Sequence, residues 1–280
     1  MEKIKIEKNS VQETLIIPLY GRKMCSEKFP ELYTDIYAER LCNRIDYDFS
    51  ELEKKNKSFL YEFGSLEAAM RQLDMIWEIK DYLKKYPKAT VVNLGCGLDD
   101  TGKACDNGLC HIVNVDFPDV ISIRKQLIID GEREKNIACD LKDYSWMEQV
   151  DGSEGVIFFA AGVFHYFKTE EVKNLVLELS KRFPEGCLVF DSVGKLGLKI
   201  ILNKVLKNMD INDVDGYFYI NNPKKELNWS ENIKVTSKGY MLGYYDMKSP
   251  GIRFSHRFFA WLGDKMMKMY VHKMEFAGKE

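Results

Sequence analysis

Hydrophobic positions along this chain follow two periods, and together the two predict an α/β fold. Continuous apolar runs bounded by turn residues indicate strands that are buried on both faces. Such runs occupy residues 89–94, 111–116, 137–139, 155–160 and 187–190, and a last strand is expected at 268–276. Apolar residues at helical spacing predict helices over 65–84 (with Ser65 as N-cap), 118–129, 169–182, 196–206 and 254–266. Because strands and helices alternate, we expect one doubly wound sheet rather than several domains.

Two aromatic-rich segments, 1–64 and 207–250, lie outside this alternation. The first shows short helical patterns around 11–17 and 35–43, interrupted by prolines 18 and 30. The second is irregular except for one expected strand near 233–236. Both could cover a ligand or simply pack against the core. We predict a single domain over 1–280, in which a core over 65–280 carries a helical cap (1–64) and an irregular cap insertion (207–250).

A glycine turn separates the first two predicted strands. The chain reads VVNLGCGLDD over residues 91–100, and the second strand ends in Asp116. Gly95 and Gly97 let the backbone turn tightly and approach a ligand, because they lack a Cβ. Asp116 lies 19 residues after Gly97, near the spacing at which a second strand's tip accepts hydrogen bonds from a ribose. The pattern predicts half of a nucleoside-binding α/β fold, and an ordinary strand-to-helix turn is the alternative.

Two phosphate-binding motifs match this turn incompletely. A dinucleotide fingerprint needs a third glycine where this chain has Asp100, preceded by Asp99. The run GLDDTGKA approaches the phosphate-loop pattern, but Ala104 replaces the hydroxyl that would hold Mg²⁺. In both motifs the two aspartates would repel a phosphate. A ligand with a ribose, an adenine and a positive centre fits this acidic turn better, and S-adenosylmethionine is such a ligand.

Composition narrows the classes of protein further. Forty-one basic and 43 acidic residues give a net charge of −2, so no basic excess favours a nucleic-acid partner. The seven cysteines are scattered without a C-x-x-C pair, and no second ligand cluster joins Cys105, Cys110 and His111, so we expect no metal. The scattered thiols, an N-terminal stretch unlike a signal peptide and short apolar runs are typical of a cytoplasmic protein without a membrane partner.

Four stretches carry a family resemblance in their order along the chain. They are VVNLGCGLDD, VNVDFPDVISIRKQL, ACDLKDYSW and VIFFAAGVFHYFKTEEVKNLV, and they cover about residues 60–192. The chain therefore resembles class I S-adenosylmethionine-dependent methyltransferases, in particular the leucine carboxyl methyltransferase and tetracenomycin-type polyketide O-methyltransferase group. In the N-terminal segment, PLYGRKMCSEKFPELYTDIYAE is similar to this family's basic pair and Asp-x-Tyr-Ala-like element. The resemblance implies a doubly wound Rossmann-like sheet of seven strands, the last antiparallel, with an N-terminal helical cap.

The resemblance also implies a cofactor, S-adenosylmethionine, and the residues that bind it. Arg71 matches the arginine that holds the methionine carboxylate, and Arg22 or Lys23 matches a basic residue that reaches this carboxylate from the cap. Asp116 matches the ribose-binding carboxylate. Asp140 and Leu141 match the pair that binds the adenine. The implied set is Arg22, Lys23, Arg71, Gly95, Cys96, Gly97, Asp116, Phe117, Asp140, Leu141, Ala160 and Ala161.

Two of these residues have ordinary structural alternatives. Arg71 could form a surface ion pair with Glu67 or Asp74 on the same helix face. Asp116 could serve as an acid near the N-terminus of the helix that Pro118 opens.

One position departs from the family pattern. Members often carry a glutamate just after the fourth strand, where this chain has Ala161 followed by Gly162. The change removes a polar contact near the sulfonium side of the cofactor and leaves room for a different acceptor. It bears on carboxyl methylation more than on methyl transfer itself.

The histidines supply the candidates for a general base. Methyl transfer is an in-line displacement, so the protein mainly aligns the nucleophile, the carbon and the sulfur. A hydroxyl acceptor must also lose a proton, whereas a carboxylate need not. His165 follows the fourth strand, at the sheet edge where ligands bind, and lies beside Tyr166. We predict O-methylation of a small-molecule hydroxyl or carboxylate with His165 and Tyr166 as catalytic residues; His111 and His272 are expected to be structural.

Two other functions remain as alternatives. A methyltransferase-like protein could bind the cofactor without catalysis, since Ala161 replaces the family glutamate. An NAD-dependent oxidoreductase could use a similar sheet, although its third glycine is missing. The expected partner is a small-molecule methyl acceptor, and the pattern indicates no particular oligomeric state.

Overall fold

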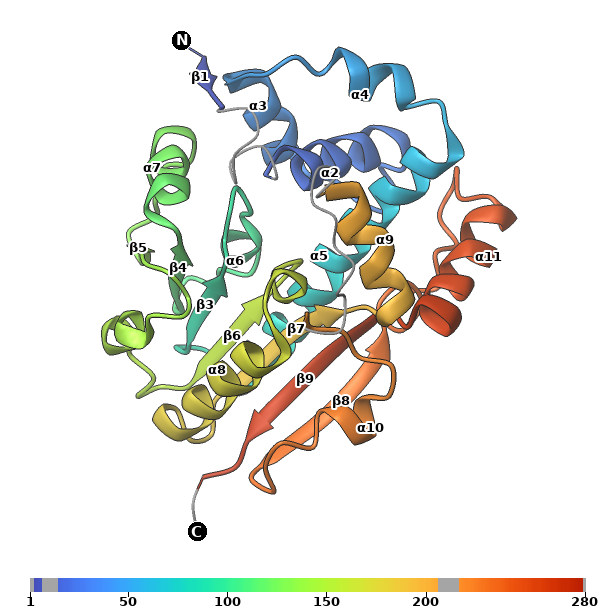
Figure 1. Ribbon diagram of the computed structural model, residues 1–280. Helices are drawn as coiled ribbons and strands as arrows, with labels where there is room; N and C mark the ends of the chain where they lie inside the picture. The colour runs from blue at the N-terminus through green and yellow to red at the C-terminus, as the bar shows by residue number, and fades with distance from the viewer. Residues whose placement is uncertain (1–2, 7–14, 206–216, 279–280) are drawn as a thin grey trace.

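Seven strands form one mixed sheet in the computed structural model, which describes residues 3–6, 15–205 and 217–278 (Figure 1). The order across the sheet is β5-β4-β3-β6-β7-β9-β8. The strands are β3 (Thr90–Leu94), β4 (His111–Asp116), β5 (Glu134–Ala138), β6 (Val156–Ala160), β7 (Cys187–Ser192), β8 (Ile233–Gly239) and β9 (Tyr270–Phe276). Strand β9 pairs antiparallel with both of its neighbours, and all other pairs are parallel. The predicted doubly wound sheet with an antiparallel last strand is confirmed.

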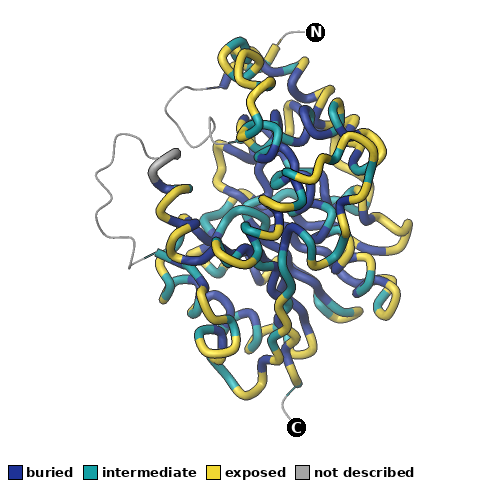
Figure 2. Tube along the Cα trace, turned by 90° about the vertical axis from the view of Figure 1, so that its right-hand side faces the viewer, coloured by how far each residue is buried: buried dark blue, intermediate teal, exposed yellow. Residues whose placement is uncertain are grey.

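Helices cover both faces of this sheet. Long helix α5 (Phe59–Lys85) and α9 (Lys195–Val205) lie on one face, and α8 (Thr169–Arg182) lies on the other. Along β6, Ile157 and Phe159 pack with the α5 side, whereas Phe158 and Ala160 pack with the α8 side. Figure 2 shows the buried strands running through the middle of the molecule. Burial on both sides explains why the strand sequences are continuous apolar runs rather than alternating ones.

The N-terminal helices lie across the carboxyl ends of the parallel strands, in the upper part of Figure 1. They are α2 (Ile16–Lys28), α3 (Ile36–Arg44) and α4 (Ser50–Lys55). Leu19 of α2 and Leu41 of α3 share a buried apolar cluster with Leu98, in the turn after β3, and with Ile123 of α7 (Pro118–Leu127). A short parallel pair, β1 (Ile4–Lys5) and β2 (Ile45–Asp46), joins the same region. These contacts attach the N-terminal segment to the glycine turn.

Two helix starts differ from the predicted ones. Helix α5 begins at Phe59, and its N-cap is Ser58, which accepts a hydrogen bond from the Tyr61 amide at 3.4 Å. The prediction of Ser65 as N-cap was wrong: Ser65 lies inside the helix and donates to the Glu62 carbonyl. Helix α2 continues through Pro18, which lies in its first turn, where a missing N–H costs no hydrogen bond. Residues 11–14 of the first helical pattern lie outside the described residues.

The remaining elements complete the C-terminal half and the loops. They are α6 (Thr101–Ala104), η1 (Tyr144–Gln149), η2 (Phe164–Tyr166), α10 (Pro223–Glu226), α11 (Phe254–Leu262) and a π-helical turn, η3 (Gly263–Met267). Strand β8 is longer than predicted and forms an edge of the sheet, so residues 233–239 belong to the core layer rather than to a cap. Helix α8 has the predicted bounds, because Glu171 accepts a hydrogen bond from the Lys168 amide and caps its start.

Candidate active site

The turn after β3 and the tip of β4 form the first part of the site. Gly95 and Gly97 both adopt left-handed backbone angles, with φ of 67° and 47°. A Cβ on Gly95 would lie 2.7 Å from a methyl group of Val163, so only glycine fits there. The carboxylate of Asp116 accepts hydrogen bonds from the amides of Gly97 and Phe117, both at 2.7 Å. Asp116 thus holds the turn and keeps lone pairs for a further donor, since a carboxylate accepts about four hydrogen bonds.

Burial changes the pKa of the Asp116 carboxylate. Asp116 is 8% exposed, and desolvation raises its pKa, while the two backbone hydrogen bonds pull the pKa back. Cys96, between the two glycines, is buried, and burial raises the pKa of its thiol. Phe117 follows Asp116 with 41% of its surface exposed. An apolar ring therefore borders a carboxylate at the end of β4, a combination that suits a nucleoside.

The acidic residues of the turn face protein cations and amides. Asp99 Oδ1 accepts a hydrogen bond from Arg22 Nη1 at 3.0 Å and from Gln72 Nε2 at 2.9 Å. The same Arg22 atom lies 3.4 Å from Asp35 Oδ2 and 3.6 Å from Asp100 Oδ1. The Arg22 side chain is only 7% exposed. One buried guanidinium, contributed by the N-terminal segment, therefore faces three carboxylates.

These contacts correct one step of the sequence argument. The turn was expected to present its two aspartates to the positive centre of a ligand, yet Asp99 is occupied by Arg22 and by further donors from Asn93 and Thr101. Burial and the neighbouring Asp99 raise the pKa of Asp100 to about 6. The sequence could not show this pairing, because Arg22 is remote from Asp99 along the chain. In the structure, Asp99 and Asp100 face Arg22 and so attach the N-terminal segment to the turn.

The two basic residues predicted to reach the cofactor from the cap have different surroundings. Arg22 also donates from Nη2 to the Leu98 carbonyl at 3.2 Å, so both terminal nitrogens of its guanidinium contact the turn. Lys23 lies on another side of α2, where its Nζ is 2.8 Å from Glu27 Oε1. The structure brings Arg22 to the glycine turn and pairs Lys23 within its own helix.

A second cluster lies where β6 and β7 end. Arg71, on α5, places Nη1 3.7 Å from Oδ2 of Asp191, a residue of β7 that is 2% exposed. The other oxygen of Asp191 accepts a hydrogen bond from the Gly162 amide at 2.6 Å. Gly162 has φ of 73°, and a Cβ there would lie 2.7 Å from Arg71 Nη1. Gly162 therefore leaves the space in which the guanidinium lies.

The ion pair of Arg71 differs from the surface pair with Asp74 that the sequence offered. The carboxylate that pairs with it is Asp191 of the sheet rather than Asp74, whose two oxygens are buried without a hydrogen-bond partner among the described residues. The family glutamate after the fourth strand is replaced by Ala161, but Asp191 supplies a carboxylate at the same edge. Of the two alanines at the end of β6, Ala160 packs on the α8 side and Ala161 packs on the α5 side, which carries Arg71.

The predicted base lies in the same cluster. His165 belongs to η2, directly after the β6 end, and is 5% exposed. Burial lowers its pKa below the usual value, and the nearby Asp191 partly offsets that effect. The Tyr166 ring contacts His165 edge-on, with ring centroids 5.5 Å apart, and is 44% exposed. His165 is therefore neutral at neutral pH, beside a tyrosine that reaches the surface.

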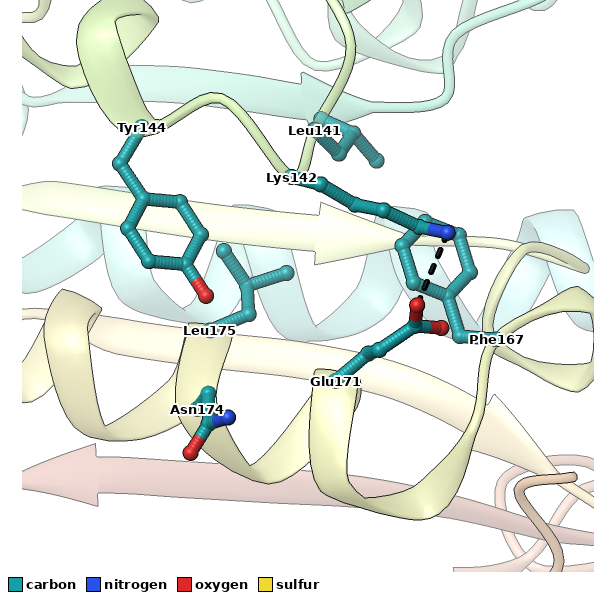
Figure 3. A pocket seen from close by; sticks show the side chains of 7 residues that line it. All are labelled: Leu141, Lys142, Tyr144, Phe167, Glu171, Asn174 and Leu175. Carbon is teal, nitrogen blue, oxygen red and sulfur yellow. Dashed lines mark ion pairs between the residues drawn. The ribbon is translucent and has the colours of Figure 1, made fainter. Parts of the chain in front are cut away.

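The end of β5 borders a small hollow, shown in Figure 3. Asp140 is half-buried and accepts a hydrogen bond from the Lys142 amide at 2.9 Å, and Leu141 is buried. An ion pair between Lys142 Nζ and Glu171 Oε1, 2.9 Å apart, crosses the hollow. Its volume is about 180 Å³, and its walls are Leu141, Lys142, Tyr144, Phe167, Glu171, Asn174 and Leu175. Of the predicted adenine-binding pair, Leu141 therefore lines open space.

Two other histidines have different surroundings. His272 is buried in β9, where its ring nitrogens lie 2.7 Å from Ser192 Oγ and Ser237 Oγ, and burial lowers its pKa to about 3. His111 is exposed at the start of β4, at the opposite edge of the sheet. Within the described parts of the chain, no group of His, Cys, Asp or Glu side chains is arranged to hold a metal ion.

Sequence reasoning missed Asp191, Gly162 and Asp35 as parts of these clusters. Asp191 carried a usable signal, because it is a carboxylate near the end of a fully apolar strand. Gly162 was seen only as a neighbour of the Ala161 departure. Asp35 belongs to the Asp-x-Tyr-Ala-like element of the resemblance, but its contact with Arg22 depends on the packing of α2 against the start of α3.

Comparisons with known proteins agree with this geometry. The model of the leucine carboxyl methyltransferase family matches residues 18–180. Tetracenomycin polyketide synthesis O-methyltransferase TcmP of Streptomyces glaucescens is 28% identical over 189 residues, which are 67% of this chain and 68% of that protein. The S-adenosyl-L-methionine-dependent methyltransferase dpfgK of Gibberella zeae is 26% identical over 268 residues, 88% of this chain and 87% of the relative.

A solved structure shows the same fold. The plantazolicin methyltransferase BpumL, in complex with a monoazolic desmethylPZN analog and SAH, superposes with a TM-score of 0.51. The match covers 96% of this chain and 99% of BpumL at 13% sequence identity. At that identity the likeness supports the fold alone.

Proposed function

Since this chain belongs to the leucine carboxyl methyltransferase family and is an S-adenosylmethionine-dependent methyltransferase, we propose that it methylates an oxygen of a small, partly apolar molecule. The observation that carries the proposal is the neutral, buried His165 beside Arg71 and Asp191 at the carboxyl edge of the sheet. The name of TcmP, an O-methyltransferase of polyketide synthesis, supports the same class of acceptor. Family membership also excludes the oxidoreductase alternative.

The residues at the strand ends have the chemistry that S-adenosylmethionine needs. Asp116 has free lone pairs for ribose hydroxyls, and Gly95 allows close approach of the backbone. Asp140 and Leu141 would hold the adenine at the end of β5. When bound, the cofactor supplies an electrophilic methyl group on a sulfonium. The chain must then align the acceptor oxygen with it and exclude water.

Arg71 is our proposed anchor for the methionine carboxylate. Its guanidinium lies at the end of the sheet, is 20% exposed, and is held from one side by Asp191. An arginine fork can bind a carboxylate through two parallel hydrogen bonds. We assign Arg22 a positioning function instead, because Asp99, Asp35 and Asp100 surround it.

Replacing Arg71 with lysine should weaken binding of S-adenosylmethionine at least about tenfold, because an ammonium group cannot reproduce the planar two-point contact. Isothermal titration calorimetry of the purified variant measures this directly. Gly162→Ala is the matched probe, since it keeps every charge while its Cβ would push Arg71 aside. Normal affinity in both variants would show that another residue anchors the carboxylate.

The acceptor is proposed to bind between the sheet edge and the cap. Tyr240, from the segment after β8, donates to the Glu67 carbonyl at 3.2 Å, one helical turn before Arg71. From the other side, the amide of Phe218 bonds the Phe167 carbonyl at 2.9 Å, next to η2. Both contacts bring parts of 217–250 to the site. Aromatic walls of this kind favour a small, partly apolar acceptor over a protein tail.

A proton acceptor is needed only for a hydroxyl acceptor. His165 is neutral above its lowered pKa, so its ring nitrogen can take a hydroxyl proton at neutral pH. The rate should therefore fall as the pH drops below 6.5 and through that lowered pKa. His165→Ala should remove this acidic limb and slow transfer by about 10²-fold or more.

A pH–rate profile on a hydroxyl acceptor, with wild type and His165→Ala, tests this assignment. His165→Gln serves as a control for packing, because His165 is buried, and thermal melts of all three proteins establish that they fold. An acidic limb that survives in both variants would show that the base lies elsewhere.

The class of acceptor is tested by measuring S-adenosylhomocysteine formation with three panels: phenols, small carboxylic acids and peptides ending in leucine. The proposal expects turnover with a member of the first two panels. Turnover confined to peptides would contradict the small-molecule assignment. Tight cofactor binding without turnover in any panel would favour the alternative of a binding protein without catalysis.

A further inference from the structure

Helix α11 turns its apolar side outward. Phe254, Phe258 and Trp261 follow one another at helical spacing and are 76%, 46% and 48% exposed. Their rings form a continuous stripe, with centroids 6.4 Å apart for the first pair and 6.1 Å for the second. The buried side of the helix carries His256 and Ala260 instead. A surface helix normally shows the opposite pattern, so this stripe is unusual for a face in contact with water alone.

Positive charge flanks the stripe. Arg257 and Lys265 make no ion pair within the described chain, whereas Arg253 is paired with Glu62. The acid between them, Asp264, turns its oxygens to the amides of Met241 and Leu242, from which they accept hydrogen bonds at 2.9 and 3.0 Å. Burial raises the pKa of Asp264, and the charge of the neighbouring Lys265 partly offsets that rise. The stripe is thus bordered by cations without an outward-facing carboxylate on the same helix.

A second helix extends this surface toward the active site. The Gly194 amide, just before α9, bonds the Met267 carbonyl of η3 at 2.7 Å. On the outer side of α9, Leu196 and Ile200 are 53% and 41% exposed, and Lys199 between them is exposed as well. Both helices lie on the outside of the molecule, with α11 at its right-hand edge in Figure 1.

This surface borders the end of the sheet where the site lies. Strand β9 runs antiparallel, so its first residue, Tyr270, pairs with Ser192 at the end of β7. Ser192 directly follows Asp191, the partner of Arg71. The segment from η3 to β9 therefore connects α11 to the same edge of the sheet that an acceptor would approach.

We propose that the α11–α9 surface docks on an anionic lipid bilayer. We define it by Phe254, Arg257, Phe258, Trp261 and Lys265 of α11 and η3, and Leu196, Lys199 and Ile200 of α9. Aromatic residues and cations on one outward face are the pattern of helices that lie in the membrane interface. No helix in the described residues is long and apolar enough to cross a bilayer, so contact would be peripheral. The earlier expectation of no membrane partner rested on the lack of a spanning segment.

Charge complementarity favours this occupant over a second copy of the chain. Across a twofold axis the same face would meet itself, so its cations would face a surface that carries the same cations. The face offers no outward carboxylate to pair with them. Anionic headgroups would satisfy these cations, and the interface region would take up the aromatic rings.

The test is co-sedimentation of the full chain with vesicles of phosphatidylcholine, with and without phosphatidylglycerol. We expect binding only to the anionic vesicles. Phe258→Ser with Trp261→Ser should weaken it at least about tenfold through lost apolar burial. Arg257→Gln with Lys265→Gln should weaken it about 25-fold, since each cation near an anionic surface contributes about fivefold.

Matched controls lie at the other edge of the molecule. Ile129→Ser changes an apolar residue that is 87% exposed, and Lys125→Gln changes an exposed cation of α7. Both should bind like wild type. The proposal is overturned if wild type ignores anionic vesicles, if the α11 variants match the controls, or if light scattering shows a dimer that Trp261→Ser dissociates. Docking is measured without turnover, so it stands or fails independently of the proposed acceptor.

Discussion

Replacing Asp116 with alanine should lower the affinity for S-adenosylmethionine by about 10²–10⁴-fold. The carboxylate is proposed to accept two ribose hydroxyls, and hydrogen bonds to a charged group contribute about 1.5–3 kcal/mol each. It also fixes the glycine turn through the Gly97 amide at 2.7 Å. Both losses act in the same direction. Isothermal titration calorimetry, with thermal melts as a check on folding, measures the effect.

Two further variants separate ribose contact from loss of the turn. Asp116→Asn keeps an acceptor for the Gly97 amide but replaces one oxygen by a donor, so it should bind more tightly than the alanine variant and less tightly than wild type. Asp140→Ala removes a half-buried carboxylate proposed to contact the adenine, and should have a smaller effect. Unchanged affinity in Asp116→Ala would remove the ribose assignment.

Replacing Arg22 with methionine should destabilise the fold by about 3–5 kcal/mol, because it leaves buried carboxylates without their cation. The guanidinium lies within 3.0–3.6 Å of Asp99, Asp35 and Asp100, and its side chain is 7% exposed. Asp99 is 24% exposed and the other two less, so water screens these charges poorly. Urea unfolding gives the change in free energy.

The double variant Arg22→Met with Asp99→Asn should recover part of this loss, since it removes one of the stranded charges. Lys23→Met is the matched control on the same helix. Its ion pair with Glu27 is an i,i+4 pair, worth about 0.3–0.5 kcal/mol. If Arg22→Met were as mild as Lys23→Met, the buried network would not hold the cap on the turn.

Much of the sheet could be predicted because its signals are local. Strand β6 is a continuous apolar run, and helix α8 has a capping glutamate at its start, so each carries its own boundaries. Strand β5 was placed too late, at 137–139, because Glu134 opens it with a polar side chain. The Glu134 carboxylate is buried against Arg124 and Lys103. Together with hydrogen bonds from Asn114 and the Gly131 amide, these partners make a buried carboxylate acceptable inside a strand.

The start of helix α5 also could not be predicted from local sequence. Ser65 had the chemistry of an N-cap, yet the helix begins at Phe59. The Phe59 ring stacks on His256 of α11 with centroids 5.3 Å apart, and the Phe63 ring meets Phe259. Packing against a helix nearly 200 positions later in the chain extends α5 by two turns. The helix propensity of residues 59–65 does not depend on that partner, so the start of α5 could not be predicted from the local sequence.

In the candidate site, too, some features have local signals and others depend on tertiary contacts. The glycine turn and Asp116 could be predicted, because the turn and the strand that follows it form one local unit in which a carboxylate returns to the Gly97 amide. The surroundings of Arg71 and Arg22 could not. Arg22 and Asp99 are 77 positions apart in the sequence. Arg71, on helix α5, pairs with Asp191 of strand β7. The sequence by itself determined which charged residues lie at the ends of helices and strands. The order of the strands and the packing of α2 and α5 decided which of these charges neutralise one another, because Coulomb attraction depends on distance in space.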